Sequence, residues 1–447
     1  MMKAKSILAG ALAVIALAVA APQVMRGIQL LKLGAADKAK VLCSAVFLAE
    51  REIEDVLNED LSVEDLWPLR WLPVTVNRDT AMVTAGFPGL ARQSAVFRPG
   101  LGCTLTQASI LPVELPPRAT PSLEMDLKAT PDARLDPVLD WAFAEPDATR
   151  LRRTRAVIIL QDGRVVGERY GPGFGPHTPL AGWSLAKVMV NALVGVLQGS
   201  GRLALGDSLG LPEWQSDEQR GITLEHLLHM SSGLEFHEEY GEPLQDVTRM
   251  LLLEKSAAAY AAGKPLIAPP GSRWYYASGS SNIISRYLHG VLGADYDGFP
   301  RKALFEPLGM TSAVMEQDAA GDFVMSSFMY ATARDWAKLG QLYLQDGQWQ
   351  GRRIFPKGWT GYSLKPAPAA PGQEYAAHLW LKVPDTYRSQ PALAIPGDAY
   401  HAIGFEGQFI TILPARGLVL VRLGLTRSTG AWLQDEFIGR VLTALPP

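Results

Sequence analysis

The chain has 447 residues, a formal net charge of −3 and a hydrophobic fraction of 48%. This length allows two or three domains, and the near-neutral charge excludes the strongly basic surface typical of nucleic-acid-binding proteins. The charged fraction of only 19%, with 42 glycines and 32 prolines, predicts a stable globular body with many turns.

The first 25 residues differ from that body. Lys3 and Lys5 precede an apolar run over residues 7–21, and small residues at the end of the run predict a cut after Ala20, as in a secretory signal. The apolar stretch continues to residue 25, which is about the span of a membrane helix. Residues 1–25 are therefore either a signal peptide or a retained membrane anchor. Both alternatives predict a periplasmic or other extracytoplasmic location, in the second case attached to the inner membrane.

The chain has two cysteines, Cys43 and Cys103. In an exported protein an even pair favours a disulfide, so we predict a Cys43–Cys103 bridge. Two buried free thiols are the alternative, which would suit a cytosolic chain.

A small N-terminal α/β unit is predicted over residues 26–116 and contains both cysteines. It has a helical segment near residues 50–61 and short strand patterns near residues 74–76, 81–84 and 95–97. It contains no cluster of chemically active residues. We expect it to pack on the larger domain or to space that domain from the membrane. A linker rich in proline and charge follows over residues 117–133.

The remaining residues, 134–447, form the second predicted domain. It opens with a hairpin around Asp162-Gly163 and closes with a second hairpin, residues 408–423, and a helix over residues 429–445. The middle is mostly helical. Strands near both ends of a domain can pair into one antiparallel sheet, so the predicted fold is an α+β sandwich: helices flank the sheet and an all-helical lobe is inserted.

A Ser-x-x-Lys motif, Ser184 to Lys187, begins the central helix of this domain. The following residues, 188–197, are apolar on every side except at Asn191, which predicts a buried helix. Residues three apart share a helix face, so Ser184 and Lys187 would meet at its N-terminal end. A basic neighbour activates serine as a nucleophile, and free N–H groups there suit an oxyanion. A chance Ser and Lys at a surface helix start is the alternative, because this motif alone is weakly specific.

A second candidate motif is Tyr276-Ala277-Ser278. Two residues that are two apart on an extended loop point to the same side, so Tyr276 and Ser278 would face one site. A phenol near a lysine can relay a proton. Because the two groups have similar free pKa values and titrate as a coupled pair, either of them could act as the base. A buried core aromatic is the alternative for Tyr276.

A third segment, residues 400–408, precedes the last hairpin. Its glycines, Gly404 and Gly407, allow a backbone to approach a ligand closely. An edge strand beside the nucleophile could supply a second oxyanion N–H group.

These three motifs in this order resemble the serine β-lactamase and penicillin-binding-protein superfamily. The resemblance is to the class C β-lactamase-like branch, and within it to 6-aminohexanoate-dimer hydrolases and esterases. It covers roughly residues 150–447 and includes further segments at residues 222–234, 274–279, 307–310, 331–335 and 407–408. It implies a β-lactamase/transpeptidase-like fold.

The resemblance also implies roles. Ser184 would form an acyl-enzyme, Lys187 would assist as a base or through its field, and Tyr276 would be the general acid/base. Ser278 stands where the superfamily often carries Asn and would orient Lys187 or the substrate. The remaining candidates for substrate binding or orientation lie in the third segment: His401, Gly404, Gly407 and Gln408.

The third segment departs from the superfamily. A Lys-Thr-Gly triplet is absent and His401-Ala402-Ile403-Gly404 occupies its place. His401 either replaces the lysine that would bind a substrate carboxylate or is structural. This departure favours ester or linear-amide hydrolysis over action on β-lactams.

The leading hypothesis is therefore an exported serine hydrolase that acts on a small ester or linear amide through an acyl-enzyme. The alternatives are penicillin-binding or β-lactamase activity on β-lactams or D-Ala peptides, and a non-catalytic ligand-binding domain of the same fold. We expect no cofactor and no nucleic-acid partner. We also expect no metal, since His226 and His229 are separated by leucines and are interpreted as helix packing.

Overall fold

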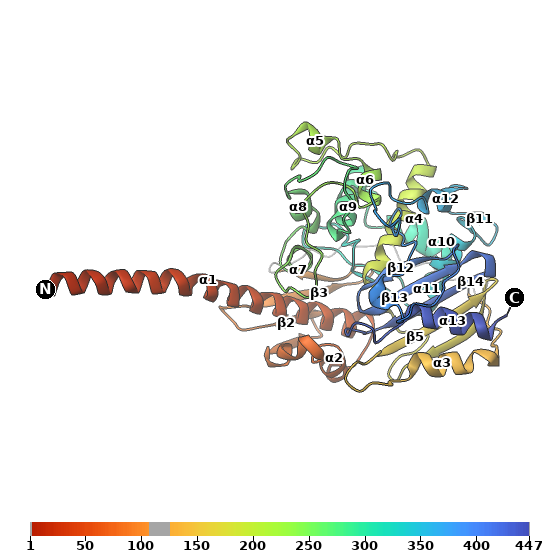
Figure 1. Cartoon of the computed structure of the whole chain (residues 1–447), viewed down its shortest axis with the longest axis horizontal. Coiled ribbons are helices and arrows are strands. Elements are labelled where there is room, and N and C mark those ends of the chain that lie inside the picture. Colours follow the sequence, from red (N-terminus) through yellow and green to blue (C-terminus); the bar gives the residue numbers. More distant parts are fainter. Residues whose placement is uncertain (1, 107–125, 447) are drawn as a thin grey trace.

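The computed structural model describes residues 2–106 and 126–446. It consists of a long N-terminal helix with a small sheet, and a larger body in which a sheet and a helical lobe lie side by side (Figure 1).

The N-terminal helix α1 spans Met2–Cys43 without interruption, with Pro22 inside it. Its first half projects from the body, and its second half lies against the small sheet (Figure 1). Within the described ranges, no helix has both the length and the apolarity needed to cross a membrane. The interpretation of residues 1–25 as a signal peptide or an anchor stays a prediction.

The small unit is built on a four-stranded antiparallel sheet of order β1-β2-β3-β4. Its strands are Val74–Asn77, Met82–Ala85, Gln93–Arg98 and Gly102–Thr106, and the helix α2 spans Ile53–Glu59. The last strand, β4, was not expected from the sequence. It carries Cys103, which forms the predicted disulfide with Cys43 at the end of α1. The disulfide lies within an apolar core that α1 shares with the sheet.

One of the contacts between the small unit and the larger body is made by a buried carboxylate, Glu316. Glu316 has no exposed surface, and it pairs with Lys40 of α1. It also accepts hydrogen bonds from the Ser44 hydroxyl at 2.8 Å and the Cys103 backbone N–H at 2.7 Å. This carboxylate of the larger body therefore receives three donors from the small unit, and ion pairs such as Arg427–Asp65 join the same two parts.

The larger body is built on a five-stranded antiparallel sheet of order β12-β13-β14-β5-β6. Its strands are Tyr400–Gly404, Gln408–Leu413, Leu418–Gly424, Thr154–Gln161 and Arg164–Tyr170. This arrangement confirms that strands from both ends of the domain share one sheet. Residues 128–132, expected to be linker, instead hydrogen-bond to the backbone of β6.

Helices cover both faces of this sheet. On one face lie α3, Asp136–Phe143, and α13, Gln434–Ala444. On the other lie α4, Ala186–Gly199, and α11, Ala333–Leu344. Gly340 of α11 has no room for a side chain, because a Cβ there would lie 2.5 Å from Val419 of the sheet. Apolar side chains that alternate along the strands thus point to opposite faces of the sheet and contribute to two separate cores.

The buried helix α4 contains the single polar exception that the sequence analysis noted. Asn191 is fully buried, donates to the Ala377 carbonyl at 2.9 Å, and accepts from Tyr343, Trp359 and Ser363. A buried amide is tolerated only when it is hydrogen-bonded, as it is here.

The inserted lobe is helical, as predicted, and lies beyond α4 on the side away from the large sheet (Figure 1). Its helices are α5 Asp217–Arg220, α6 Leu224–Leu228, α7 Asp246–Leu252, α8 Ala257–Ala262 and α9 Ser278–Leu292. A three-stranded sheet of order β7-β9-β8 has the strands Leu180–Ala181, Met329–Ala331 and Val314–Met315. Smaller elements complete the body: α10 Glu306–Leu308, α12 Trp359–Ser363 and the strands Gln348–Trp349 and Arg352–Arg353.

Candidate active site

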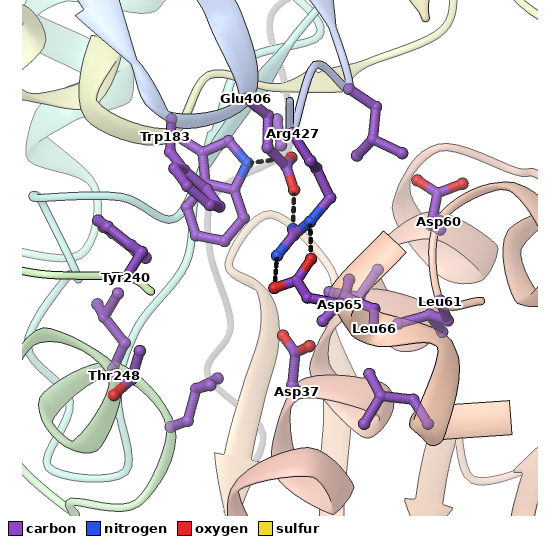
Figure 2. Close-up of a pocket in the computed structure, with 18 of the residues that line it drawn as sticks. Asp37, Asp60, Leu61, Asp65, Leu66, Trp183, Tyr240, Thr248, Glu406 and Arg427 are labelled. Atoms are coloured by element: carbon purple, nitrogen blue, oxygen red, sulfur yellow. Dashed lines mark hydrogen bonds and ion pairs between the residues drawn. The ribbon is translucent and has the colours of Figure 1, made fainter. Parts of the chain in front are cut away.

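Ser184 lies in a tight turn, Trp183–Leu185, that leads directly into α4. Trp183 has a φ of 47°, which is strained for a bulky residue and persists only where the surroundings hold it. Its indole N–H donates to Glu406 at 2.9 Å, and Arg427 holds Glu406 at 2.6 Å (Figure 2). The turn therefore presents Ser184 at the N-terminal end of a buried helix.

Lys187 is placed as the sequence predicted, against Ser184. Its ammonium donates to the Ser184 hydroxyl at 2.8 Å, to the Ser278 hydroxyl at 3.0 Å and to the Ser326 carbonyl at 3.0 Å. These contacts use all three of its donors. Only 1% of Lys187 is exposed. Burial lowers the pKa of Lys187 to about 8, against the opposing field of the Glu238 carboxylate. A lysine with this pKa is partly neutral near neutral pH and can accept a proton.

Ser278, at the start of α9, is completely buried and joins Lys187 to Glu238. Its hydroxyl donates to one Glu238 oxygen at 2.5 Å, and its backbone N–H donates to the other at 2.8 Å. Of the two roles considered for Ser278, this geometry fits the orientation of Lys187.

Glu238 is a residue of this site that the sequence did not predict. It lies in an acidic segment, Glu235 to Glu239, in which nothing local distinguishes it from its neighbours. Burial raises the pKa of Glu238, whereas Lys187 and the Ser278 donors oppose the rise. The negative charge of the Glu238 carboxylate favours the protonated form of Lys187 and so raises its pKa, against the effect of burial.

The phenol ring of Tyr276 lies over the same ammonium, with the Lys187 nitrogen 4.9 Å from the ring centroid. Tyr375 and Trp380 contact the ring from its other sides, at centroid distances of 5.6 and 5.3 Å. Burial and the Glu238 carboxylate raise the pKa of Tyr276 far above its usual value, although the Ser184 hydroxyl acts in the opposite direction. The pKa of the Tyr276 phenol is thus shifted upward, whereas that of the neighbouring Lys187 is lowered.

The edge strand β12 comes close to the nucleophile at Gly404. A Cβ at this position would lie 2.3 Å from the Gly182 carbonyl oxygen, so only glycine permits the approach. The next residue, Phe405, packs edge-on against Trp183 at a centroid distance of 5.5 Å. The predicted approach of an edge strand to the nucleophile is present in the structure.

His401 does not replace the missing lysine. Its neighbours Tyr400 and Ala402 belong to the core that contains α4, whereas Ala399 and Ile403 belong to the opposite core. Because strand side chains alternate between faces, His401 points away from Ser184. Its ring hydrogen-bonds to Thr411 at 2.8 Å, and burial lowers its pKa to about 3. A neutral histidine on the far face is structural.

Gly407 and Gln408 make close contacts within the protein itself, and a substrate-binding role for them stays a prediction. Gly407 has a φ of 76°, and a Cβ there would lie 2.6 Å from the Arg422 guanidinium. The Gln408 amide bonds to Gly424 in both directions, at 2.7 and 2.9 Å, and to the Phe405 carbonyl at 3.1 Å. The Gln408 amide bonds to the Phe405 and Glu406 carbonyls and so supports the turn that carries these two residues.

His226 and His229, the two histidines considered as metal ligands, hydrogen-bond to groups of the lobe itself. His226 bonds to the Thr223 backbone N–H and so caps α6, and His229 bonds to the Glu225 carbonyl at 3.2 Å. No group of three or more potential metal ligands occurs in residues 2–106 and 126–446.

The geometry can be compared with known proteins. A 6-aminohexanoate-dimer hydrolase of Paenarthrobacter ureafaciens is 25% identical over 261 residues, which cover 55% of this chain and 66% of the relative. The chain thus spans slightly less than two thirds of that relative.

Solved structures share the fold. One is a Bacillus anthracis protein whose name assigns it to the 6-aminohexanoate-dimer hydrolases (TM-score 0.57, 21% identity, 71% of this chain and 85% of the other). Another is a penicillin-binding protein homologue from Caulobacter crescentus (TM-score 0.54, 18% identity, 70% and 96%). A third is EstCE1, a hydrolase with promiscuous acyltransferase activity (TM-score 0.53, 15% identity, 70% and 97%).

The sequence profile of the family described as Beta-lactamase matches residues 139–430, which include the nucleophile turn, α9 and the whole five-stranded sheet. The chain therefore belongs to the beta-lactamase family.

Proposed function

We propose that the protein is a serine hydrolase that cleaves a small ester or linear amide through an acyl-enzyme on Ser184. The observation that carries this proposal is the buried Lys187 nitrogen, 2.8 Å from the Ser184 hydroxyl, with its pKa lowered to about 8. A base adjacent to a serine hydroxyl, at the end of a helix with free N–H groups, is the arrangement that acyl transfer needs.

In this mechanism, neutral Lys187 takes the Ser184 proton as the hydroxyl oxygen attacks the acyl carbon. The oxyanion is held by the Ser184 N–H and by the backbone where Gly404 brings β12 close. Tyr276, a phenol at working pH, donates the proton that the leaving oxygen or nitrogen requires. Water then releases the acyl group by the reverse proton movements. Ser278 and Glu238 keep Lys187 in position throughout.

The third segment, residues 400–408, is the reason for proposing an ester or linear amide as the substrate in place of a β-lactam. Penicillins and peptide C-termini carry a carboxylate, and a lysine in that segment would bind it. Here His401 is neutral and faces Thr411, so the segment offers no cation at that position. The Paenarthrobacter relative is named a 6-aminohexanoate-dimer hydrolase, and a dimer of an amino acid is joined by an amide, which agrees with this choice. Action on β-lactams or D-Ala peptides is the second candidate.

We also propose that the protein is exported. The fully buried Cys43–Cys103 disulfide supports this, since such bonds persist in oxidising compartments.

The test is the intact mass of the protein after treatment with a fluorophosphonate probe. The wild type should gain one adduct that maps to Ser184, and Ser184→Ala should gain none. Ser200→Ala, at the other end of α4, is the matched control and should be labelled like the wild type. An absent adduct on folded wild-type protein would refute the proposal and favour a non-catalytic binding domain.

A further inference from the structure

Two segments meet at the nucleophile turn, and a hydrogen bond between Trp183 and Glu406 joins them. Trp183 precedes Ser184, and Glu406 follows the part of β12 that approaches the turn at Gly404. The Trp183 indole N–H donates to one oxygen of the buried Glu406 carboxylate at 2.9 Å. Both residues have a left-handed backbone, with φ values of 47° and 62°. This conformation is unfavourable for residues other than glycine, so surrounding contacts must hold it.

Arg427 connects this hydrogen bond to the N-terminal unit. It donates to the second Glu406 oxygen at 2.6 Å, and two of its other guanidinium nitrogens donate to the two oxygens of Asp65, each at 2.8 Å. Asp65 lies in the helical turn Glu64–Trp71 of the N-terminal unit. Figure 2 shows these side chains in line, from Asp65 through Arg427 and Glu406 to Trp183. We refer to these four side chains as the Asp65–Trp183 chain.

The geometry of the Asp65–Trp183 chain allows a movement at one end to reach the other. A two-pronged pair between a guanidinium and a carboxylate fixes orientation as well as distance. Because Asp65 and Glu406 use different nitrogens of Arg427, the plane of this guanidinium is set by both carboxylates. Burial raises the pKa of Glu406, whereas Arg427 and the Trp183 donor oppose the rise. Arg427 therefore helps to keep Glu406 charged, and a charged carboxylate is the stronger acceptor for the indole.

Asp65 lies outside residues 139–430, which match the family profile. The Asp65–Trp183 chain thus joins the family domain to a segment outside the match. The side chains of Trp183 and Glu406 bond to one another and to Arg427 rather than to Ser184 or Lys187. Any influence on the reaction is therefore exerted through the position of the nucleophile turn.

We propose that the N-terminal unit positions the nucleophile turn through the Asp65–Trp183 chain, with Glu406 and Trp183 as positioning residues. The inference rests on the proposed function for its effect on acylation, whereas the mechanical link between Asp65 and Trp183 does not. It gives a part in the reaction to a unit in which the sequence showed no cluster of chemically active residues.

The kinetic test is the second-order rate constant for labelling of Ser184 by the fluorophosphonate probe in the full-length protein. Trp183→Phe keeps an aromatic ring but removes the indole N–H. It should lower the rate constant about tenfold, because a small displacement of a reacting group is enough to slow it. Asp65→Asn should lower it about two- to fivefold, since 65% of the Asp65 side chain is exposed and an exposed ion pair contributes little. The double variant should react like Trp183→Phe alone, because both changes break the same chain.

The matched control is Glu64→Gln. Glu64 is the neighbour of Asp65 and also pairs with the larger body, through Arg153 at 2.5 Å, but it is not part of the Asp65–Trp183 chain. This variant should be labelled at the wild-type rate. An equal loss in Glu64→Gln would mean that Asp65 acts through docking in general and would overturn the proposal. Unchanged labelling of Asp65→Asn, or losses that multiply in the double variant, would overturn it as well.

The indole ¹H–¹⁵N spectrum of tryptophan-labelled protein tests the link without any reaction. The Trp183 signal is the one that Trp183→Phe lacks. Asp65→Asn should shift this signal, because the acceptor Glu406 changes its position, and Glu64→Gln should leave it in place. An unmoved signal in folded Asp65→Asn would overturn the link. A wild type that takes no probe would refute the proposed hydrolase, and the indole signal would then decide the link by itself.

Discussion

Replacing Glu238 by glutamine tests the assignment of Lys187 as the base. The change removes one negative charge and nearly preserves shape. Two hydrogen bonds, of 3.0 and 2.5 Å, connect the Lys187 nitrogen to the Glu238 oxygen through Ser278. Opposite charges at this range typically shift a pKa by about one to two units. Since Glu238 stabilises the ammonium form, its loss should lower the pKa of Lys187 from about 8 by that amount.

The assay is the pH dependence of kcat/KM for a chromogenic ester between pH 5 and 10. In the wild type, kcat/KM should rise with pH through about 8, as Lys187 becomes neutral. In Glu238→Gln this rise should lie about one to two pH units lower. The maximal kcat/KM at high pH should also fall for two reasons. A weaker base is less effective, and the amide nitrogen of glutamine cannot accept a hydrogen bond from the Ser278 N–H group.

The matched control is Glu235→Gln, which removes the same charge from a side chain with 41% of its surface exposed in the same segment. It should leave the pH profile unchanged. An unshifted profile in folded Glu238→Gln, or a shift to higher pH, would refute the reasoning that Glu238 sets the protonation of a basic Lys187.

Three further predictions concern the scaffold. The Cys43→Ser/Cys103→Ser double variant should lower the free energy of unfolding by about 4 kcal/mol, since the disulfide closes a loop with a sequence separation of 60; an unchanged urea midpoint would contradict this. Lys40→Met should lower the free energy of unfolding in urea by about 3–5 kcal/mol, because Glu316 is left buried without its ion-pair partner. The N-terminal unit of this variant should also become sensitive to limited proteolysis. The double variant Lys40→Met/Glu316→Leu should recover most of the lost stability. His401→Ala should lower stability by about 2 kcal/mol and leave kcat/KM at the wild-type value; a large loss of activity in folded protein would restore His401 to the site.

Local patterns predicted much of the fold correctly. The two hairpins of the large sheet, the buried helix after Ser184 and the helical lobe follow from alternation, turn residues and apolar runs, because these features depend on neighbours in sequence. The pairing of Ser184 with Lys187 follows from helix geometry alone. The disulfide follows from the presence of two cysteines in a chain expected to be exported.

Other features depend on contacts between distant segments, and the tertiary structure alone decided them. His401 lies in the expected segment, but the pleat of β12 turns it away from Ser184. Glu238 resembles its acidic neighbours until the fold brings it to Ser278, 40 residues away in sequence. The docking of the N-terminal unit depends on contacts such as the Lys40–Glu316 pair, whose members are 276 residues apart in sequence. The sequence thus determined most of the fold and the contact between Ser184 and Lys187, because local periodicity encodes them. Tertiary packing determined which charges face one another, because a charge acts through distance in space rather than along the chain.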